Sequence, residues 1–301
     1  MEVGAARQRV RLYERGTPAE GFAVTDRDVS ILRDLADNRF MTTQQFQAVH
    51  GPRITARLKL LFRHGLIERP KAGRFWRFRE GGGSNALLLA LAHQGAVVLA
   101  GRGYPEALAR DWTELNRELS QFSPAIPHIL DLAAVKVAFR KAVNDVPSLE
   151  LKQGFELSRE LALMVPGRNR RLVPDWTITL GMADAAIDPS LFFIEKDKGS
   201  EPNRRHGSPW LQSLVFKFSG YLAYGRARRH HRQFGLKNFR VLTIVDGGET
   251  KMANVARTAF EVTGGIGVER FLVTSSAELS QLGPLRCAWL NAAGQATFLA
   301  P

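Results

Sequence analysis

Apolar positions near the N-terminus repeat with the period of short amphipathic helices. The first helix is expected to begin after Thr25, because Thr25 and Asp28 have nearly the spacing of a capping box, and to end at Asn38. A second, shorter helix is expected after the N-cap pair Thr42-Thr43, and the Gly51-Pro52 pair would break it.

A third helix and a group of short strands follow. The helix is expected over about 53–64, with Gly65 as its C-cap. Alternating residues then predict a strand over 66–69, a basic turn over 70–74 and a returning strand over 75–79. Another strand over 86–91 and a helix over 95–101 complete this part. Three short helices and a hairpin with a basic tip predict an N-terminal winged helix-turn-helix domain.

The second half of the chain has a different pattern, in which strands and helices alternate. A polar connection over 103–124 precedes it. The expected elements are a helix over 127–143, strands over 149–155, 171–180 and 190–197, a helix over 210–229, a strand over 239–245, a helix over 250–263 and a strand over 269–274. This order predicts an α/β domain with a mixed central sheet. We therefore expect a basic arm over 1–21, a winged helix-turn-helix domain over 22–110 and an α/β domain over 111–301.

Charge points to a polyanionic partner. The chain carries 42 Lys and Arg against 29 Asp and Glu, a formal net charge of +13. Residues 1–110 hold 18 of the basic and 10 of the acidic residues, and residues 202–240 hold nine basic residues and no acid. Charge of this size suits nucleic acid, although a basic protein without such a partner fits it too.

Other features of the sequence indicate in which cellular compartment the protein is expected. Cys287 is the single cysteine, which excludes an intrachain disulfide framework and a thiolate metal cluster. The N-terminus lacks the apolar region of a signal peptide, and no apolar run is long enough for a membrane span. We expect a cytoplasmic protein without a membrane partner.

The winged helix-turn-helix pattern makes double-stranded DNA the expected partner. In such domains the third helix enters the major groove and the wing touches the flanking backbone. On the polar side of the third helix, the candidates for base and phosphate contacts are Arg53, Thr55, Arg57 and Lys59. On the wing, the candidates for phosphate contacts are Lys71, Arg74 and Arg77. The alternatives are a solvated helix face or a module that docks protein.

Two acidic positions suggest metal chemistry in the second half. Asp175 and Glu195 lie at the ends of strands that a hairpin joins, and adjacent strands are about 4.8 Å apart, so the carboxylates can converge. Converging carboxylates suit Mg²⁺ or Mn²⁺, which take oxygen ligands and can activate a water for attack on a phosphate. The alternative is that these carboxylates have no role in metal binding, because strands often end in charged residues at solvent.

These motifs together resemble known families. Pro174-Asp175 and the acidic strand resemble the PD-(D/E)XK nuclease superfamily, which implies a restriction-endonuclease-like fold. The chain also resembles the replication-relaxation family of mobile-element proteins over most of residues 22–275. The segments that carry this resemblance are TDRDVSILRDLADNRFMTTQQF, RLKLLFRHGLIER, LVPDW and FFIEKDKGSEP. The resemblance implies a role in plasmid or integrated-element DNA processing.

The resemblance also implies site residues. Asp175 and Glu195 would be metal ligands, but the superfamily pattern wants a lysine two positions after Glu195, where this chain has Asp197. Lys196 would face the opposite side of the strand. Either Asp197 is a third ligand and Lys217 on the next helix supplies the positive charge, or the site is not catalytic. Lys217 as a solvated surface residue is the competing interpretation.

A dense basic run, residues 226–232, ends the long helix of the second half. Cations at this position complement the helix dipole. Within the run, Arg228 and Arg229 are candidates for holding a DNA backbone beside the acidic site.

Two functions follow from the sequence, with the question of enzymatic activity left open. The first is a plasmid or mobile-element DNA-processing protein with a Mg²⁺-dependent endonuclease or nickase site. The second is a non-enzymatic replication initiator, relaxation accessory factor or transcriptional regulator with a degenerate nuclease-like domain, which Asp197 favours. Plasmid replication or conjugation proteins are further candidate partners. A homodimer stays open, since winged-helix proteins often dimerise although this chain has no coiled-coil heptads.

Overall fold

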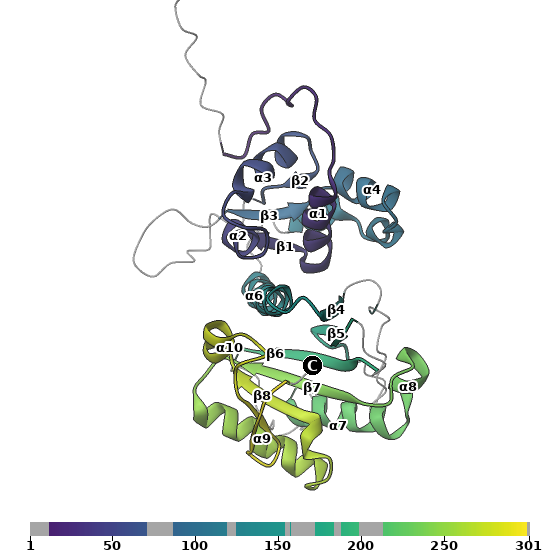
Figure 1. Cartoon of the computed structure of the whole chain (residues 1–301), viewed down its shortest axis with the longest axis vertical. Coiled ribbons are helices and arrows are strands. Elements are labelled where there is room, and N and C mark those ends of the chain that lie inside the picture. Colours follow the sequence, from purple (N-terminus) through teal and green to yellow (C-terminus); the bar gives the residue numbers. More distant parts are fainter. Residues whose placement is uncertain are drawn as a thin grey trace, which may run out of the picture. The chain divides into compact units, whose positions relative to one another are not determined.

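The computed structural model describes residues 12–70, 87–118, 125–153, 157, 172–183, 188–198 and 213–299. The chain divides into two compact units, residues 1–133 and 134–301 (Figure 1). The division falls within one helix, whereas the sequence placed a domain boundary after residue 110.

Unit 1 begins with the expected helices, and their caps explain where they start. Helix α1 (Asp26–Asn38) has a complete capping box formed by Thr25 and Asp28. Helix α2 (Thr43–His50) has a second one, in which Thr42 and Gln45 satisfy each other's backbone amides. Helix α3 (Ile54–Arg63) follows and buries Ile54, Leu58, Leu61 and Phe62.

A small antiparallel sheet completes the core of unit 1. Its strands are β1 (Phe40–Thr42), β2 (Ile67–Glu68) and β3 (Leu88–Leu91), in the order β1-β3-β2. Strand β1 was not expected, because the sequence of this segment indicates only a short link between two helices. The predicted returning strand over 75–79 and its basic turn lie outside the described residues.

The segment after the sheet is more ordered than its polar composition indicates. Helix α4 (His93–Gly101) is followed by the 3₁₀ helix η2 (Pro105–Ala109) and by helix α5 (Trp112–Glu118). The prediction of a polar connection over 103–124 is therefore wrong for its described part. Trp112 is the reason, because its ring is buried and its Nε1–H donates to the Ala107 carbonyl at 2.6 Å.

Unit 2 is built on a seven-stranded mixed sheet of order β10-β9-β8-β7-β6-β5-β4. The strands are β4 (Leu149–Gln153), β5 (Trp176–Met182), β6 (Ser190–Asp197), β7 (Phe239–Val245), β8 (Phe271–Ser275), β9 (Trp289–Asn291) and β10 (Ala296–Thr297). The central strands β6, β7 and β8 are parallel, and the other pairs are antiparallel. The expected mixed sheet is confirmed, with two C-terminal strands that the sequence did not predict.

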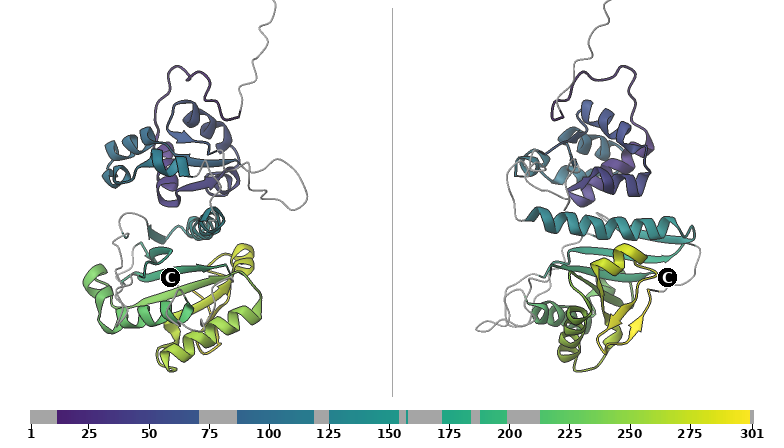
Figure 2. Two further views of the ribbon diagram at one scale, coloured as in Figure 1. Left: turned by 180° about the vertical axis from the view of Figure 1, so that it is seen from behind. Right: turned by 90° about the vertical axis from the view of Figure 1, so that its left-hand side faces the viewer.

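Helices cover both faces of this sheet, as Figure 2 shows. They are α6 (Ala125–Asn144), α7 (Leu214–Arg226), α8 (Arg229–Phe234), α9 (Glu249–Thr263), the 3₁₀ helix η4 (Val268–Arg270) and α10 (Ser276–Leu282). Phe193 of β6 packs with Phe218 of α7 and Val255 of α9 in the main core. On the other face, Phe139 of α6 meets the Trp176 ring edge-on at 5.5 Å. Among the described residues, no helix combines the length and the apolar character that a membrane crossing requires.

Candidate active site and nucleic-acid interface

The antiparallel pair β5 and β6 brings two acidic residues to the same end of the sheet. Trp176 pairs with Ile194, so Asp175 directly before β5 comes next to Glu195. The backbone N–H of Lys196 donates to Asp175 Oδ2 at 2.8 Å, which holds this carboxylate against β6. The convergence of Asp175 and Glu195 expected from the sequence is present in the structure.

Helix α7 supplies the partners of Glu195. The Glu195 side chain is 2% exposed, and its Oε2 lies 2.9 Å from Lys217 Nζ. Its other oxygen, Oε1, accepts a hydrogen bond from the Tyr221 hydroxyl. Lys217 and Tyr221 are four residues apart, which places both on one face of the helix. The sequence named Lys217 as the substitute lysine, and the structure brings it to Glu195.

Burial governs the charge on Glu195. It raises the pKa of Glu195 to about 7; the ion pair with Lys217 lowers that pKa, whereas the nearby carboxylate of Asp175 raises it. The same burial, together with the Glu195 charge, raises the pKa of the Tyr221 hydroxyl well above its ordinary value. Tyr221 is therefore a stable hydrogen-bond donor to Glu195 at neutral pH.

Asp197 shares a strand face with Glu195 but has a different partner. Its Oδ2 lies 3.3 Å from Lys251 Nζ on α9, and its side chain is 1% exposed. Among the described residues, no group of three His, Cys, Asp or Glu side chains is arranged to hold a metal ion. The set Asp175, Glu195 and Asp197 is therefore not gathered around one point, and its role as a metal site stays a prediction.

Lys196 lies on the opposite strand face, as alternation requires. Its Nζ is 2.7 Å from Asp246 Oδ1 and donates to the Asp197 carbonyl at 3.3 Å. Asp246 also accepts from Ser276 Oγ at 2.6 Å. Burial of Asp246 works to raise its pKa, but the hydrogen bonds from Lys196 and Ser276 outweigh it and lower the pKa. Lys196 is thus tied to the end of β7 and is directed away from Glu195.

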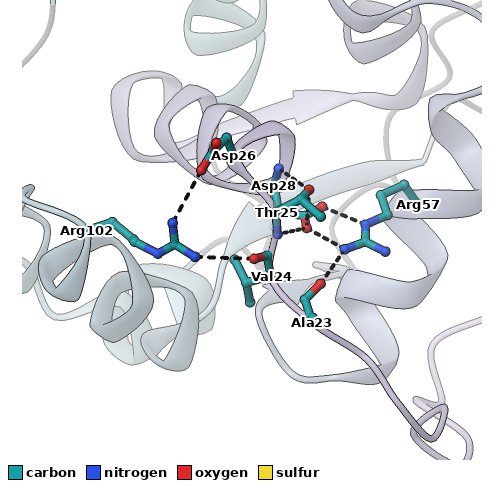
Figure 3. A network of polar contacts seen from close by, with 7 residues as sticks. All are labelled: Ala23, Val24, Thr25, Asp26, Asp28, Arg57 and Arg102. Atoms are coloured by element: carbon teal, nitrogen blue, oxygen red, sulfur yellow. Dashed lines mark hydrogen bonds and ion pairs between the residues drawn. The ribbon is translucent and has the colours of Figure 1, made fainter.

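In unit 1, the exposed side of α3 carries part of the predicted DNA-contact set. Arg53, Thr55 and Lys59 are exposed, and Thr55 Oγ1 accepts a hydrogen bond from Gln47 of α2 at 3.2 Å. Arg57 differs from them, as Figure 3 shows. Its Nε donates to Asp28 Oδ1 at 2.7 Å and its Nη2 to the Ala23 carbonyl at 2.8 Å. The guanidinium of Arg57 is therefore engaged within the unit.

The remaining predicted contacts fall elsewhere. Lys71, Arg74 and Arg77 lie outside the described residues. Arg228 and Arg229 are not beside the acidic site, because α7 runs antiparallel to β6 and ends near the start of β7. His230 of α8 packs on the Phe239 ring at 5.1 Å. The expectation that this basic run adjoins the acidic residues is wrong, since the crossover connection carries it to the other end of the sheet (Figure 1).

Sequence reasoning missed Lys251 and Asp246 as partners of the β6 charges. Each follows the end of β7, at the edge where the parallel strands end. The available signal was the Asp246-Gly247-Gly248 turn after an apolar strand, which marks a strand end. The pairing itself depends on β7 lying next to β6, which the chain order alone leaves open.

Comparisons with known proteins give one family. Residues 32–238 match the replication-relaxation family, and this span covers more than half of the chain and includes parts of both units. The searches of curated proteins and of solved structures returned no match. On this match, the chain belongs to the replication-relaxation family.

Proposed function

We propose that this chain is a DNA-binding protein of plasmid or mobile-element DNA processing, with a Mg²⁺-dependent deoxyribonuclease site in unit 2. The observation that carries the nuclease proposal is the grouping of Asp175, Glu195 and Lys217 at one end of β5, β6 and α7. The family indicates a role in plasmid or mobile-element replication or relaxation. Unit 1 would bring the DNA to this site.

The case for DNA binding by unit 1 is its element order. The order α1-β1-α2-α3-β2-β3, with a sheet of order β1-β3-β2, supports a winged helix-turn-helix fold for this unit. In that fold α3 would lie in the major groove. Arg53 at the N-cap of α3, and Thr55 and Lys59 on the helix, are exposed and would contact bases and phosphates there.

The donor chemistry of unit 2 fits a hard divalent cation. Carboxylate oxygens of Asp175 and Glu195 would hold it, since Mg²⁺ in phosphoryl-transfer sites commonly uses one or two carboxylates and the substrate phosphate. The element order α6-β4-β5-β6-α7-β7 supports a PD-(D/E)XK domain. When bound, the cation would polarise the scissile phosphate and lower the pKa of a water.

Two residues of α7 have distinct roles in this proposal. Lys217 offsets negative charge at Glu195 and would offset the charge that develops on the phosphate in the transition state. Tyr221 donates to Glu195 Oε1 and fixes the rotation of that carboxylate. Lys217 would therefore replace the lysine that the motif has two positions after Glu195.

One observation favours a non-enzymatic alternative. Both Glu195 oxygens have protein partners, and Asp197 is paired with Lys251. A site in which the protein satisfies its own carboxylates suits a degenerate scaffold. In that case the chain would be an initiator, accessory factor or regulator that binds DNA without cutting it.

Cleavage of supercoiled plasmid and single-stranded DNA, with Mg²⁺ or Mn²⁺, separates the two functions. We expect cleavage by the wild type that is abolished in Asp175→Ala and in Glu195→Gln, with DNA affinity unchanged. Glu150→Gln is the matched control, because Glu150 is an exposed acid on β4. Binding without cleavage, equal in all variants, would establish the non-enzymatic function instead.

A further inference from the structure

A basic surface lies at the end of the unit 2 sheet opposite to the carboxylates. We call it the amino-edge surface and define it by Arg226, Arg228, Arg229, Arg232, Lys237 and Arg240. The described stretch from Ser213 to Arg240 contains no acidic residue. Charge of one sign over a helix end and the next strand gives a field that attracts polyanions.

A pocket adjoins this surface. It is lined by Asp188, Pro189, Ser190 and Leu191 at the start of β6, and by Lys237, Asn238, Phe239 and Arg240 at the start of β7. Asp188 faces Lys237 across the pocket with 3.8 Å between Oδ2 and Nζ, and both side chains are more than half exposed. An exposed pair at this distance is weak, so Lys237 can turn to a ligand phosphate.

The backbone of Arg228 supplies independent evidence. Arg228 adopts φ 50 and ψ 30, a left-handed conformation that glycine adopts without strain. The C-cap of the same helix α8, Gly235, has a left-handed conformation too, with φ 74. Arg39 is the other described residue besides glycine with a positive φ, and Arg228 differs from it in lying on the amino-edge surface, which makes its side chain the one to test there.

The strand register places this surface relative to the proposed site. Leu191 pairs with Phe239 at the pocket, and Glu195 pairs with Thr243 four residues later. Four residues of strand span roughly 13 Å, which corresponds to about four base pairs along a DNA strand. One DNA molecule can therefore reach both ends of the sheet.

From these observations we infer that the amino-edge surface binds the phosphate backbone of DNA, about four base pairs from the proposed cleavage site. The interaction reads no sequence, because its groups are guanidinium and ammonium donors suited to phosphate oxygens. Its role is to fix the path of the substrate over the sheet. The inference rests on the proposed function, in that it assigns a further surface to the same DNA.

The test compares salt dependence of DNA binding by the full chain and two single variants, Arg228→Gly and Lys237→Gln. The probe is a labelled duplex of unrelated sequence. Each variant should bind several-fold more weakly, and the slope of log affinity against log salt should become shallower by about 0.9 for each phosphate that the variant does not neutralise. Arg257→Gln is the matched control, because Arg257 is exposed on α9 outside the surface.

Arg228→Gly also separates a binding role from a structural one. Glycine relieves the left-handed backbone, so the thermal midpoint should not fall while DNA binding weakens. Unchanged slopes in both variants, with wild-type binding intact, would overturn this inference and leave the proposed function standing. A wild type that does not bind DNA would overturn both, and equal weakening in Arg257→Gln would reduce the effect to net charge.

Discussion

Arg57 and Lys59 lie two positions apart on α3, and their surroundings give them different roles. The Asp28 carboxylate is fully buried, and Arg57 provides its charge partner. Burial of Asp28 works to raise its pKa, but the hydrogen bonds from Arg57 and Thr25 outweigh it and lower the pKa below the ordinary value. Lys59 is exposed. Arg57 therefore holds α3 against the start of α1, and Lys59 is available to a ligand.

Arg57→Ala is expected to destabilise unit 1 by about 3 kcal/mol at neutral pH, because it leaves a buried carboxylate without its cation. Because the pKa of Asp28 is lowered in the folded state, the wild type holds this stabilisation above the ordinary pKa of Asp. It loses the stabilisation as pH falls through the folded pKa. Without Arg57, only the hydrogen bonds from Thr25 oppose the effect of burial and the pKa of Asp28 is lowered less, so the difference between variant and wild type should shrink in acid.

Urea unfolding at neutral and acidic pH, with hydrogen exchange of the α1 and α3 amides, measures this effect. Lys59→Ala is the control and should change stability by less than about 0.5 kcal/mol. A difference between Arg57→Ala and wild type that stayed constant with pH would argue against the Asp28 pair as its source.

The two buried tyrosines of α7 test the positioning of Glu195. Tyr221 donates to the Glu195 carboxylate, whereas Tyr224 donates to the neutral Gln233 side chain at 2.9 Å. Phenylalanine keeps the packing on the Phe193 ring in both cases. We expect Tyr221→Phe to lower the cleavage rate by roughly tenfold, since a charge-assisted hydrogen bond contributes about 1.5–3 kcal/mol. Tyr224→Phe should cut DNA at nearly the wild-type rate, and an equal decrease in both would assign the effect to packing.

At the scale of elements, caps and alternation made much of the secondary structure predictable. The capping pair Thr25 and Asp28 predicted the start of α1, and the apolar runs at 190–197 and 239–245 predicted the bounds of β6 and β7. The break between α7 and α8 was not predictable, because it occurs at Arg228 rather than at glycine or proline. Helix α5 was missed for a similar reason, since one buried tryptophan outweighs a polar neighbourhood.

Close packing of α4 in unit 1 gives a prediction at this scale. A Cβ at Gly95 would overlap the Leu66 carbonyl and lie 2.8 Å from Leu91 Cδ1, whereas nothing lies within 4 Å of a Cβ at Gly101. Gly95→Ala should therefore destabilise unit 1 by about 1–3 kcal/mol through overpacking. Gly101→Ala in the same helix should be neutral or stabilising by up to about 1 kcal/mol. Thermal unfolding of the two variants measures this, and equal midpoints would contradict the close approach of α4 to the Leu66 carbonyl.

At the scale of the whole molecule, the site was partly predictable because strand alternation is local and strand order is not. Alternation separated Glu195 from Lys196, and helical spacing nominated Lys217. The pairing of Asp197 with Lys251 required the neighbour of β6 to be known. The predicted position of the basic run was wrong, because the direction of α7 across the sheet decides at which end of the sheet the run lies.

The division into two units leads to a last prediction, on how binding and cleavage combine. If α3 of unit 1 contacts DNA and unit 2 cuts it, Arg53→Gln with Lys59→Gln should weaken DNA binding by roughly tenfold or more. The salt slope should become shallower by about 1.8, or 0.9 for each of the two phosphates that these side chains would neutralise. Cleavage at saturating DNA should be unchanged, because neither residue belongs to the carboxylate site.

Asp175→Ala should show the converse, with intact affinity and no cleavage. Substitutions that share no interaction partner have additive free energies, so the triple variant should have the affinity of the unit 1 double variant. Loss of cleavage at saturating DNA in Arg53→Gln with Lys59→Gln would mean that unit 1 takes part in the reaction rather than delivering its substrate.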